Sequence, residues 1–324
     1  MRLRIKRYQL IILLALAAFA LPLVLRDDYQ LNIATAIGIN TIVVLGLNLL
    51  IGYAGQVSLG QAAFVGLGAY ASGILTTKLG ISPWLAMLAG VALGALIGAI
   101  VGVPLLKLRG HYLAMGTLGF GMIANIVMVQ WESLTDGTVG IMSIPPLALG
   151  KLTLDTELRM YCLVAAAVVL CMTLASNIID SRVGRAMRAV HGSEVAAEVS
   201  GVDTSKYKLQ VFVLSAAMAG LAGSLFAHQS TYIHPDTFGF HYSIQLLVMA
   251  VLGGMASIWG AIFGAAAVTL IGEHLRQFQE FSAIAFGAVL ILFMIFMPAG
   301  LWRGLGDLLK RARRLHHWAR PTEV

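Results

Sequence analysis

The charged residues of this chain lie between its long hydrophobic runs or at their ends, and none lies in the middle of a run. Its 324 residues are 59% hydrophobic and only 11% charged, whereas a soluble globular domain carries roughly 25% charged residues. A helix needs about 20 apolar residues to cross the hydrocarbon core of a bilayer. The pattern therefore predicts a multi-span membrane protein whose membrane interior holds no fixed charge.

Ten hydrophobic runs are candidate membrane spans by their hydropathy and length. We expect each run to form a helix, so that the chain is an all-α polytopic membrane protein and residues 1–324 form a single transmembrane domain. The ten runs cover about residues 8–25, 30–51, 61–79, 84–106, 112–131, 159–176, 209–228, 241–253, 260–275 and 281–299.

Lysine and arginine are distributed unequally between the two sides that ten spans define. With the N-terminus in the cytoplasm, the cytoplasmic side receives 17 basic residues and the opposite side receives 5. The positive-inside rule requires a bias of this kind. We therefore expect both termini in the cytoplasm, together with a polar loop at 177–208 and a basic tail at 301–324. Because the net charge of +7 arises at membrane flanks, anionic lipid headgroups are a better partner than nucleic acid.

The chain carries no recognisable catalytic or metal-binding motif. The phosphate-cradling pattern G-x-x-x-x-G-K-[ST] is absent, and so are H-E-x-x-H and any Cys/His cluster with metal-ligand spacing. No nucleophile–base pair suited to a membrane hydrolase can be assembled either. We expect no catalytic residue, no metal and no cofactor bound by this chain.

The stretch from Leu49 to Gln61 interrupts the hydrophobic pattern with glycines and uncharged polar residues. Non-helical backbone at membrane depth must be buried in protein or line a cavity, and transporters use discontinuous helices at their substrate pathway. We therefore expect discontinuous or re-entrant backbone here; a short interfacial turn with tightly packed glycines is an equal alternative. The candidate pathway residues are Gly52, Gly55, Gln56, Ser58 and Gly60, with Thr117 and Gly119 from the fifth run.

A second uncharged interruption covers residues 252–260, between the eighth and ninth runs. Both interruptions are expected on the same side of the membrane, which suggests a weak internal repeat. Small residues also recur at every fourth position of the fourth run. Close packing between helices accounts for this spacing without a functional role. The residues concerned are Gly90, Gly94, Gly98 and Gly102.

The loop 177–208 contains the signals of a short helix. Ser193 is a suitable N-cap, Glu194 lies in the first turn where the helix dipole favours an anion, and Gly201 supplies a C-terminal stop. Val195 and Val199 form an apolar stripe beside the face that Glu194 shares with Glu198. A helix of about two turns is too short to be stable alone, so we expect it to dock on a partner.

Several of these motifs resemble one protein family. Ala196-Ala197 followed by Gly201 is similar to the EAA loop through which ABC-importer permeases couple to their ATPase, although the glutamate of a strict E-A-A would fall on Val195. In its context, the loop resembles that of branched-chain amino acid permeases of the LivM type. The other motifs, in a resemblance that runs from about residue 40 to 300, are Gly184-Arg185, 211–223, 52–64, 108–121, Thr135-Asp136-Gly137 and Ile144-Pro145-Pro146.

The resemblance implies a permease that forms half of a translocation pore in a bacterial inner membrane. Its implied partners are a second, homologous permease, two cytoplasmic ABC ATPase subunits that hydrolyse ATP, and a periplasmic or extracellular substrate-binding protein. The helix at 193–201 is then the lever through which ATP-driven motion enters. The residues that the resemblance assigns to ATPase coupling are Gly184, Arg185, Glu194, Ala196, Ala197 and Gly201.

Three alternatives remain at this point. A urea or short-chain amide permease of the same transporter class would have a similar sequence. A gradient-driven secondary carrier would need intramembrane carboxylates or an ion site built from backbone carbonyls. A passive channel would explain the glycines, but not the helix at 193–201.

Overall fold

The computed structural model of the chain describes residues 2–25, 27–149, 152–153 and 155–275, and the isolated positions 287, 288, 291, 295, 300 and 301. Helices dominate this part of the chain. A two-residue hairpin pairs β1 (Ala148–Leu149) with β2 (Leu152–Thr153). The α-helices are α1 (Arg2–Val24), α2 (Asp28–Asn48), α3 (Gln61–Thr77), α4 (Pro83–Leu105), α5 (His111–Gln130), α6 (Glu132–Thr135), α7 (Glu157–Asp180), α8 (Arg182–Gly192), α9 (Glu194–Val199), α10 (Thr204–Ser230), α11 (Phe240–Gly253) and α12 (Ile258–Leu275).

Nine of the ten hydrophobic runs coincide with helices, because long apolar stretches satisfy their backbone only by internal hydrogen bonds. Among the described residues, six helices are long and apolar enough to cross a membrane: α2 with its extension to Tyr53, α4, α5, α7, α10 and α12. The apolar part of α1 and the whole of α11 are shorter. The tenth run, 281–299, and the tail 301–324 lie almost entirely outside the described residues.

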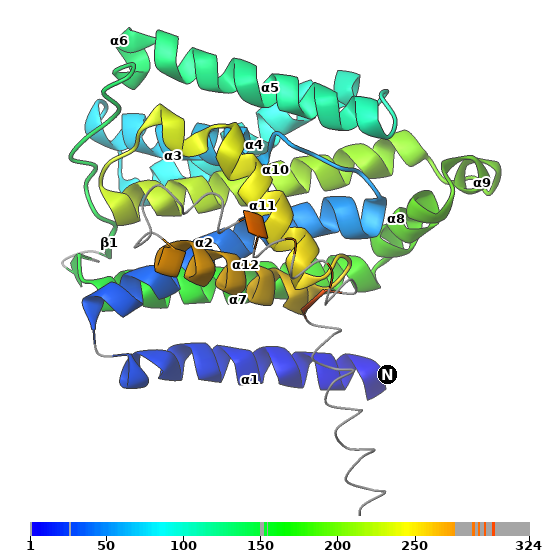
Figure 1. Cartoon of the computed structure of the whole chain (residues 1–324), viewed down its shortest axis with the longest axis horizontal. Helices are drawn as coiled ribbons and strands as arrows, with labels where there is room; N and C mark the ends of the chain where they lie inside the picture. The colour runs from blue at the N-terminus through cyan, green and yellow to red at the C-terminus, as the bar shows by residue number, and fades with distance from the viewer. Residues whose placement is uncertain are drawn as a thin grey trace, which may run out of the picture.

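The long helices lie side by side, as Figure 1 shows, with α8 and α9 at one end of the bundle and α6 and β1 at the other. The turn between α4 and α5 belongs to the α9 end, because Arg109 Nε lies 3.5 Å from Glu194 Oε2. Two of the basic segments that the charge pattern assigned to one side, 107–109 and 182–208, therefore share one end of the molecule. We refer to it as the basic end.

The centre of the bundle is a close contact between α4, α10 and α3 that depends on glycine. The four regularly spaced glycines of α4 are all buried. A Cβ at Gly94 would lie 2.7 Å from the carbonyl oxygen of Ala216, and a Cβ at Gly98 would lie 2.7 Å from the Ala216 side chain. The prediction that the spacing serves close helix packing is thus confirmed.

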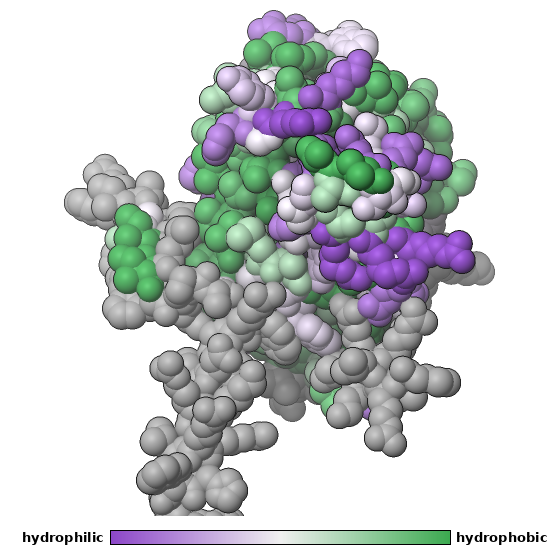
Figure 2. All heavy atoms as spheres, turned by 90° about the vertical axis from the view of Figure 1, so that its right-hand side faces the viewer, coloured by the Kyte–Doolittle hydropathy of each residue, from purple (hydrophilic) through white to green (hydrophobic). Residues whose placement is uncertain are grey.

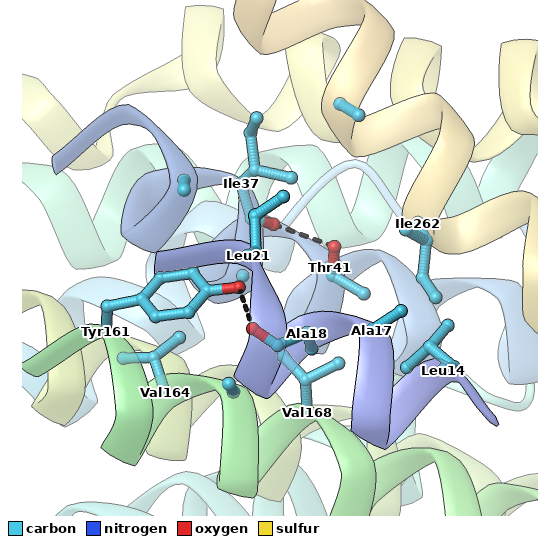
Figure 3. A pocket seen from close by; sticks show the side chains of 14 residues that line it. Leu14, Ala17, Ala18, Leu21, Ile37, Thr41, Tyr161, Val164, Val168 and Ile262 are labelled. Carbon is cyan, nitrogen blue, oxygen red and sulfur yellow. Dashed lines mark hydrogen bonds between the residues drawn. The ribbon is translucent and has the colours of Figure 1, made fainter. Parts of the chain in front are cut away.

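Helix α1 lies along the outside of the bundle and packs mainly against α7. Pro22 stands inside α1 and has no backbone N–H, so it cannot bond to the carbonyl of Ala18 one turn earlier. The Tyr161 hydroxyl of α7 donates a hydrogen bond of 2.9 Å to this carbonyl. Figure 3 shows the bond at the edge of an apolar cavity of about 350 Å³ between α1, α2, α7 and α12. The proline therefore creates the acceptor that α7 recognises.

Replacing Tyr161 with phenylalanine leaves the Ala18 carbonyl without a partner, and we expect it to weaken the docking of α1 by about 1–3 kcal/mol. Cys162, which packs beside this contact, should then react faster with a membrane-permeant maleimide. Pro22→Ala restores the missing N–H within α1. The effect of Tyr161→Phe should consequently shrink in the double variant, and an undiminished effect on the Pro22→Ala background would contradict this account.

Candidate functional site

The first interruption is a real break in the backbone. Helix α2 passes into a five-residue π-helix, η1 (Leu49–Tyr53), and the chain then runs without regular structure from Gly55 to Gly60 before α3 begins. Gly55 adopts a φ of +68°, which favours glycine. The discontinuous backbone expected from the glycines is therefore present, and it lies next to the basic end.

Side chains of other helices satisfy the backbone of this break. The backbone N–H of Leu59 donates to Thr117 Oγ1 of α5 at 2.9 Å, and the N–H of Ala62 donates to Ser243 Oγ of α11 at 3.1 Å. Gln61 reaches α10, where its Nε2 donates to the Ser215 carbonyl at 3.0 Å. Helices α5 and α11 thus provide two hydrogen bonds that water would provide outside a membrane, and Gln61 joins the start of α3 to α10.

The pathway glycines differ in what surrounds them. A Cβ at Gly60 would collide with the carbonyl oxygen of Thr117, and a Cβ at Gly52 would collide with the backbone nitrogen of Ala256. Gly119, in contrast, has no atom from beyond its chain neighbours and its own helical backbone within 4 Å of a Cβ placed on it. Gly52 and Gly60 are required by close backbone approach, while Gly119 faces open space.

Gln56 and Ser58 are buried in the break, whereas Gly55 and Val57, which alternate with them along the chain, are exposed. Gln56 is only 5% exposed, and its Oε1 has no hydrogen-bond partner. Ser58 Oγ accepts a long bond of 3.5 Å from the N–H of Gly60. A buried amide oxygen without a partner is uncommon in folded proteins, so Gln56 has unused capacity to accept a hydrogen bond.

The second interruption lies directly against the first. Between α11 and α12 the chain forms a turn in which Gly254 has a φ of 110° and Ala256 a φ of 59°. Asn48, at the end of α2, and Tyr53, at the end of η1, hydrogen-bond to this turn. The two breaks, some 200 residues apart in the sequence, therefore form one structural unit.

Helices α8 and α9 form the projecting part of the basic end. Ser193 caps α9 by accepting a hydrogen bond of 3.3 Å from the N–H of Ala196. Gly201 follows the helix with a φ of +81°, and the N–H of Val202 bonds to the carbonyl of Ala197 at 3.0 Å. The predicted start and end of this short helix are both confirmed.

The carboxylates of α9 anchor the helix to its own chain. Glu194 forms ion pairs with Lys208 of α10 and with Arg109, and Glu198 Oε1 accepts a hydrogen bond of 2.7 Å from Thr204. Because Glu194 is engaged in these ion pairs, its first role is to hold α9 in place. A free carboxylate for a partner is not what the structure presents at this position.

The apolar side chains of α9 are exposed instead. Val195 is 62% exposed and Val199 is 85% exposed, while Ala197 is buried against the protein. Figure 2 looks onto this end of the bundle and shows hydrophilic side chains spread over it with hydrophobic ones between them. Both valines are therefore accessible at the surface of a helix that ion pairs hold to the rest of the chain.

Of the remaining residues predicted to couple to the ATPase, some are buried in the protein and others are exposed. Gly184 is buried where a Cβ would collide with the carbonyl of Ile179, which also accepts a hydrogen bond of 3.2 Å from Arg188. Arg185 and Ala196 are exposed. The six residues therefore form one local unit, in which only some are available to a partner.

Sequence reasoning missed the residues that connect these elements. His191, at the end of α8, touches the first break: a Cβ at Gly55 would lie 3.0 Å from His191 Nδ1. Asn48 is one of three asparagines in the run 30–51, with Asn32 and Asn40, so the sequence offered an amide in an apolar stretch but did not single out Asn48. The partners of Glu194 carried no local signal, because they come from two distant segments.

Known proteins resemble this chain over most of its length. Residues 29–298 match the sequence model of a family described as branched-chain amino acid transport system / permease component. This range begins after α1.

Among individual relatives, the high-affinity branched-chain amino acid transport system permease protein LivM of Salmonella typhimurium is 32% identical over 258 residues, which is 72% of this chain and 61% of the relative. The permease protein LivH of the corresponding system in Escherichia coli is 36% identical over 124 residues, covering 37% of this chain and 40% of LivH. The ribose import permease protein RbsC of Haemophilus influenzae is 27% identical over 281 residues, covering 83% and 81%. The chain thus spans about 61% of the length of LivM, and no solved structure matches it.

The glycines of the site give a matched pair of variants. Gly52→Ala drives a methyl group into the backbone of Ala256, and we expect it to destabilise the protein by about 1–3 kcal/mol, as overpacking does. Gly119→Ala adds the same methyl group to open space in a helix and should preserve stability or raise it by about 0.5–1 kcal/mol. Thermal unfolding in detergent measures both, and equal behaviour of the two variants would contradict the close approach at Gly52.

Proposed function

We propose, because the chain belongs to the family of permease components of branched-chain amino acid transport systems, that it is the membrane-spanning subunit of an ATP-binding cassette importer. Its cargo is a branched-chain amino acid (leucine, isoleucine or valine), in keeping with the branched-chain amino acid transport system to which LivM belongs. The chain forms half of the pore, and a homologous permease forms the other half. This pairing is supported by its similarity to both LivM and LivH.

The observation that carries the proposal is the valine surface of α9. An apolar surface on a short, ion-paired helix at the basic end fits a protein groove, and the ATPase subunits of an importer supply such a groove on the cytoplasmic side. Two ATPase subunits bind and hydrolyse the ATP, and a periplasmic or extracellular binding protein delivers the substrate to the opposite end. Residues 177–208 serve as the ATPase-coupling loop, within a single permease domain over residues 1–324.

The basic end then faces the cytoplasm of a bacterial cell, with the protein in the inner membrane. The positive-inside rule supports this orientation, and ten spans with both termini inside agree with it. The basic residues of the tail 301–324 assign it to the same side. Transport energy enters through α9, because the hydrophobic runs carry no charge in their middle with which to use an ion gradient.

The substrate pathway runs past the first break. Gln56, with its unpartnered amide oxygen, and Ser58 offer uncharged hydrogen-bonding groups, while Gly119 leaves open space on α5. A zwitterionic amino acid with an apolar side chain can pass such a surface without fixed counter-charges. Gly52, Gly55 and Gly60 keep the backbone close to this route, in which Thr117 takes part through its bond to the break.

The substitution Val199→Asp tests whether α9 contacts the ATPase subunits. Val199→Asp introduces a charge into the proposed interface, so ATPase co-purifying with the permease should fall by about tenfold. Val139→Asp is the control, because Val139 is also an exposed valine, at 60%, and follows α6 at the opposite end. Undiminished ATPase on Val199→Asp would remove α9 from the interface.

Uptake by the purified complex tests the transport function. Proteoliposomes that hold the permeases and ATPases should accumulate labelled leucine only when ATP and binding protein are both supplied on their proper sides. Labelled urea serves as the competing cargo. Accumulation of leucine without ATP would support a secondary carrier instead, and accumulation of urea in place of leucine would reassign the cargo within the same class.

A further inference from the structure

Two side chains tie the two backbone breaks together. Asn48 uses both ends of its amide: Nδ2 donates to the carbonyl of Ser257 at 2.8 Å and to that of Gly254 at 3.4 Å, and Oδ1 accepts from the N–H of Ala256 at 2.9 Å. The Tyr53 hydroxyl donates to the carbonyl of Ala256 at 2.8 Å. Four hydrogen bonds thus hold one four-residue turn.

This turn has few other means of satisfying its backbone. Helix α11 ends at Gly253 and α12 begins at Ile258, so the groups between them lie outside both helical ladders. Asn48 is only 2% exposed, so these bonds are formed away from solvent. An unpaired backbone group in such surroundings costs several kcal/mol, which makes the shape of the turn dependent on α2 and η1.

The same region of the first break also touches the basic end. Helix α8 contacts η1, and the imidazole of His191 lies against Gly55, two residues beyond Tyr53. Gly52, which also belongs to η1, is packed so closely on Ala256 of the turn that no side chain fits there. A continuous series of contacts therefore runs from α9 and α8 through η1 to the turn between α11 and α12.

A second asparagine on α2 provides a contrast. Asn40 lies eight residues before Asn48 and also bonds to α11 and α12: its Oδ1 accepts from the Tyr242 hydroxyl at 2.8 Å, and its Nδ2 donates to Thr269 Oγ1 at 3.1 Å. These bonds join regular helices through side chains alone. The bonds of Asn48 reach main-chain groups of a non-helical turn, so of these two asparagines Asn48 is the one that positions the turn.

We propose that Asn48 and Tyr53 are positioning residues that make the two breaks move as one body, so that displacement of α8 and α9 reaches the start of α12. The proposal rests on the transport function proposed above and adds the route by which the motion crosses the subunit. Asn48 and Tyr53 touch neither ATP nor the ATPase surface. Their loss should therefore separate ATP hydrolysis from uptake.

Asn48→Leu, which keeps the branched shape of the side chain and removes the amide, is the first variant. We expect ATP hydrolysis by the reconstituted complex to stay near the wild-type rate, while leucine uptake per ATP falls about tenfold. Tyr53→Phe removes one hydroxyl and should lower the same ratio by a smaller factor. Asn40→Leu and Tyr242→Phe are the matched controls, which should leave the ratio unchanged even where stability falls.

A distance measurement tests, without any transport, whether Asn48 and Tyr53 hold the two breaks together. Spin labels at Val57→Cys and Met255→Cys, both exposed positions in the two breaks, should report one narrow distance distribution when Cys162 and Cys171 are replaced by alanine. Asn48→Leu should broaden that distribution and Asn40→Leu should not. The distribution does not depend on which substrate, or whether any substrate, is carried.

The outcomes separate the two proposals. If Asn48→Leu leaves the ratio of uptake to ATP hydrolysis or the label distance distribution unchanged, the proposed role of Asn48 and Tyr53 is wrong. The proposal is also wrong if Asn40→Leu lowers the ratio of uptake to hydrolysis as much as Asn48→Leu does. If the Asn48→Leu variant does not assemble, Tyr53→Phe is used instead. Wild-type values of both the uptake-to-hydrolysis ratio and the label distance distribution in Tyr53→Phe would then contradict the proposal. Failure of the wild-type complex to use ATP for uptake contradicts the transport function, while the label distances still decide whether the breaks form one body.

Discussion

Hydrocarbon offers the peptide backbone no hydrogen-bond partner, and this constraint governs the molecule wherever a helix is interrupted. The chain meets it with uncharged side chains from neighbouring helices. Thr117 and Ser243 bond to the first break, Asn48 bonds to the second, and Tyr161 bonds to the carbonyl that a proline leaves free. Each interruption is thereby joined to another helix, so the points at which the backbone departs from a helix are also the points at which the helices recognise one another.

Charge is used differently, and at a different place. The ion pairs of Glu194 with Lys208 and Arg109 lie at the basic end, where they fix a short helix that could not persist alone. Val195 and Val199 are therefore exposed on a helix, α9, whose position is fixed by ion pairs. This arrangement fits the proposed function, in which α9 is displaced by a partner subunit. The uncharged packing contacts and hydrogen bonds of the interior would then transmit the displacement.

Local features of the sequence predicted local features of the structure. The apolar runs predicted the helices, the glycines of Leu49–Gln61 predicted a break, and Ser193 with Gly201 predicted the limits of α9, since each depends on neighbouring residues alone. What could not be predicted depends on distant segments meeting. The bonds of Asn48 cross more than 200 residues, and Glu194, which resembled a coupling carboxylate, finds its partners only when Arg109 and Lys208 approach. Why Gln56 keeps an unpartnered oxygen is equally invisible in the sequence.

The bond between Tyr161 and Ala18 also bears on how the protein is made. The two residues are separated by 143 positions in the chain. At roughly 5–20 residues per second of synthesis, the ribosome adds that stretch in about 7–30 s. For this interval α1 has left the ribosome with a carbonyl that its own proline cannot satisfy, and its eventual donor has not been synthesised. The hydrogen bond that attaches α1 to the bundle must therefore wait for α7, so the order of synthesis and the order of assembly differ.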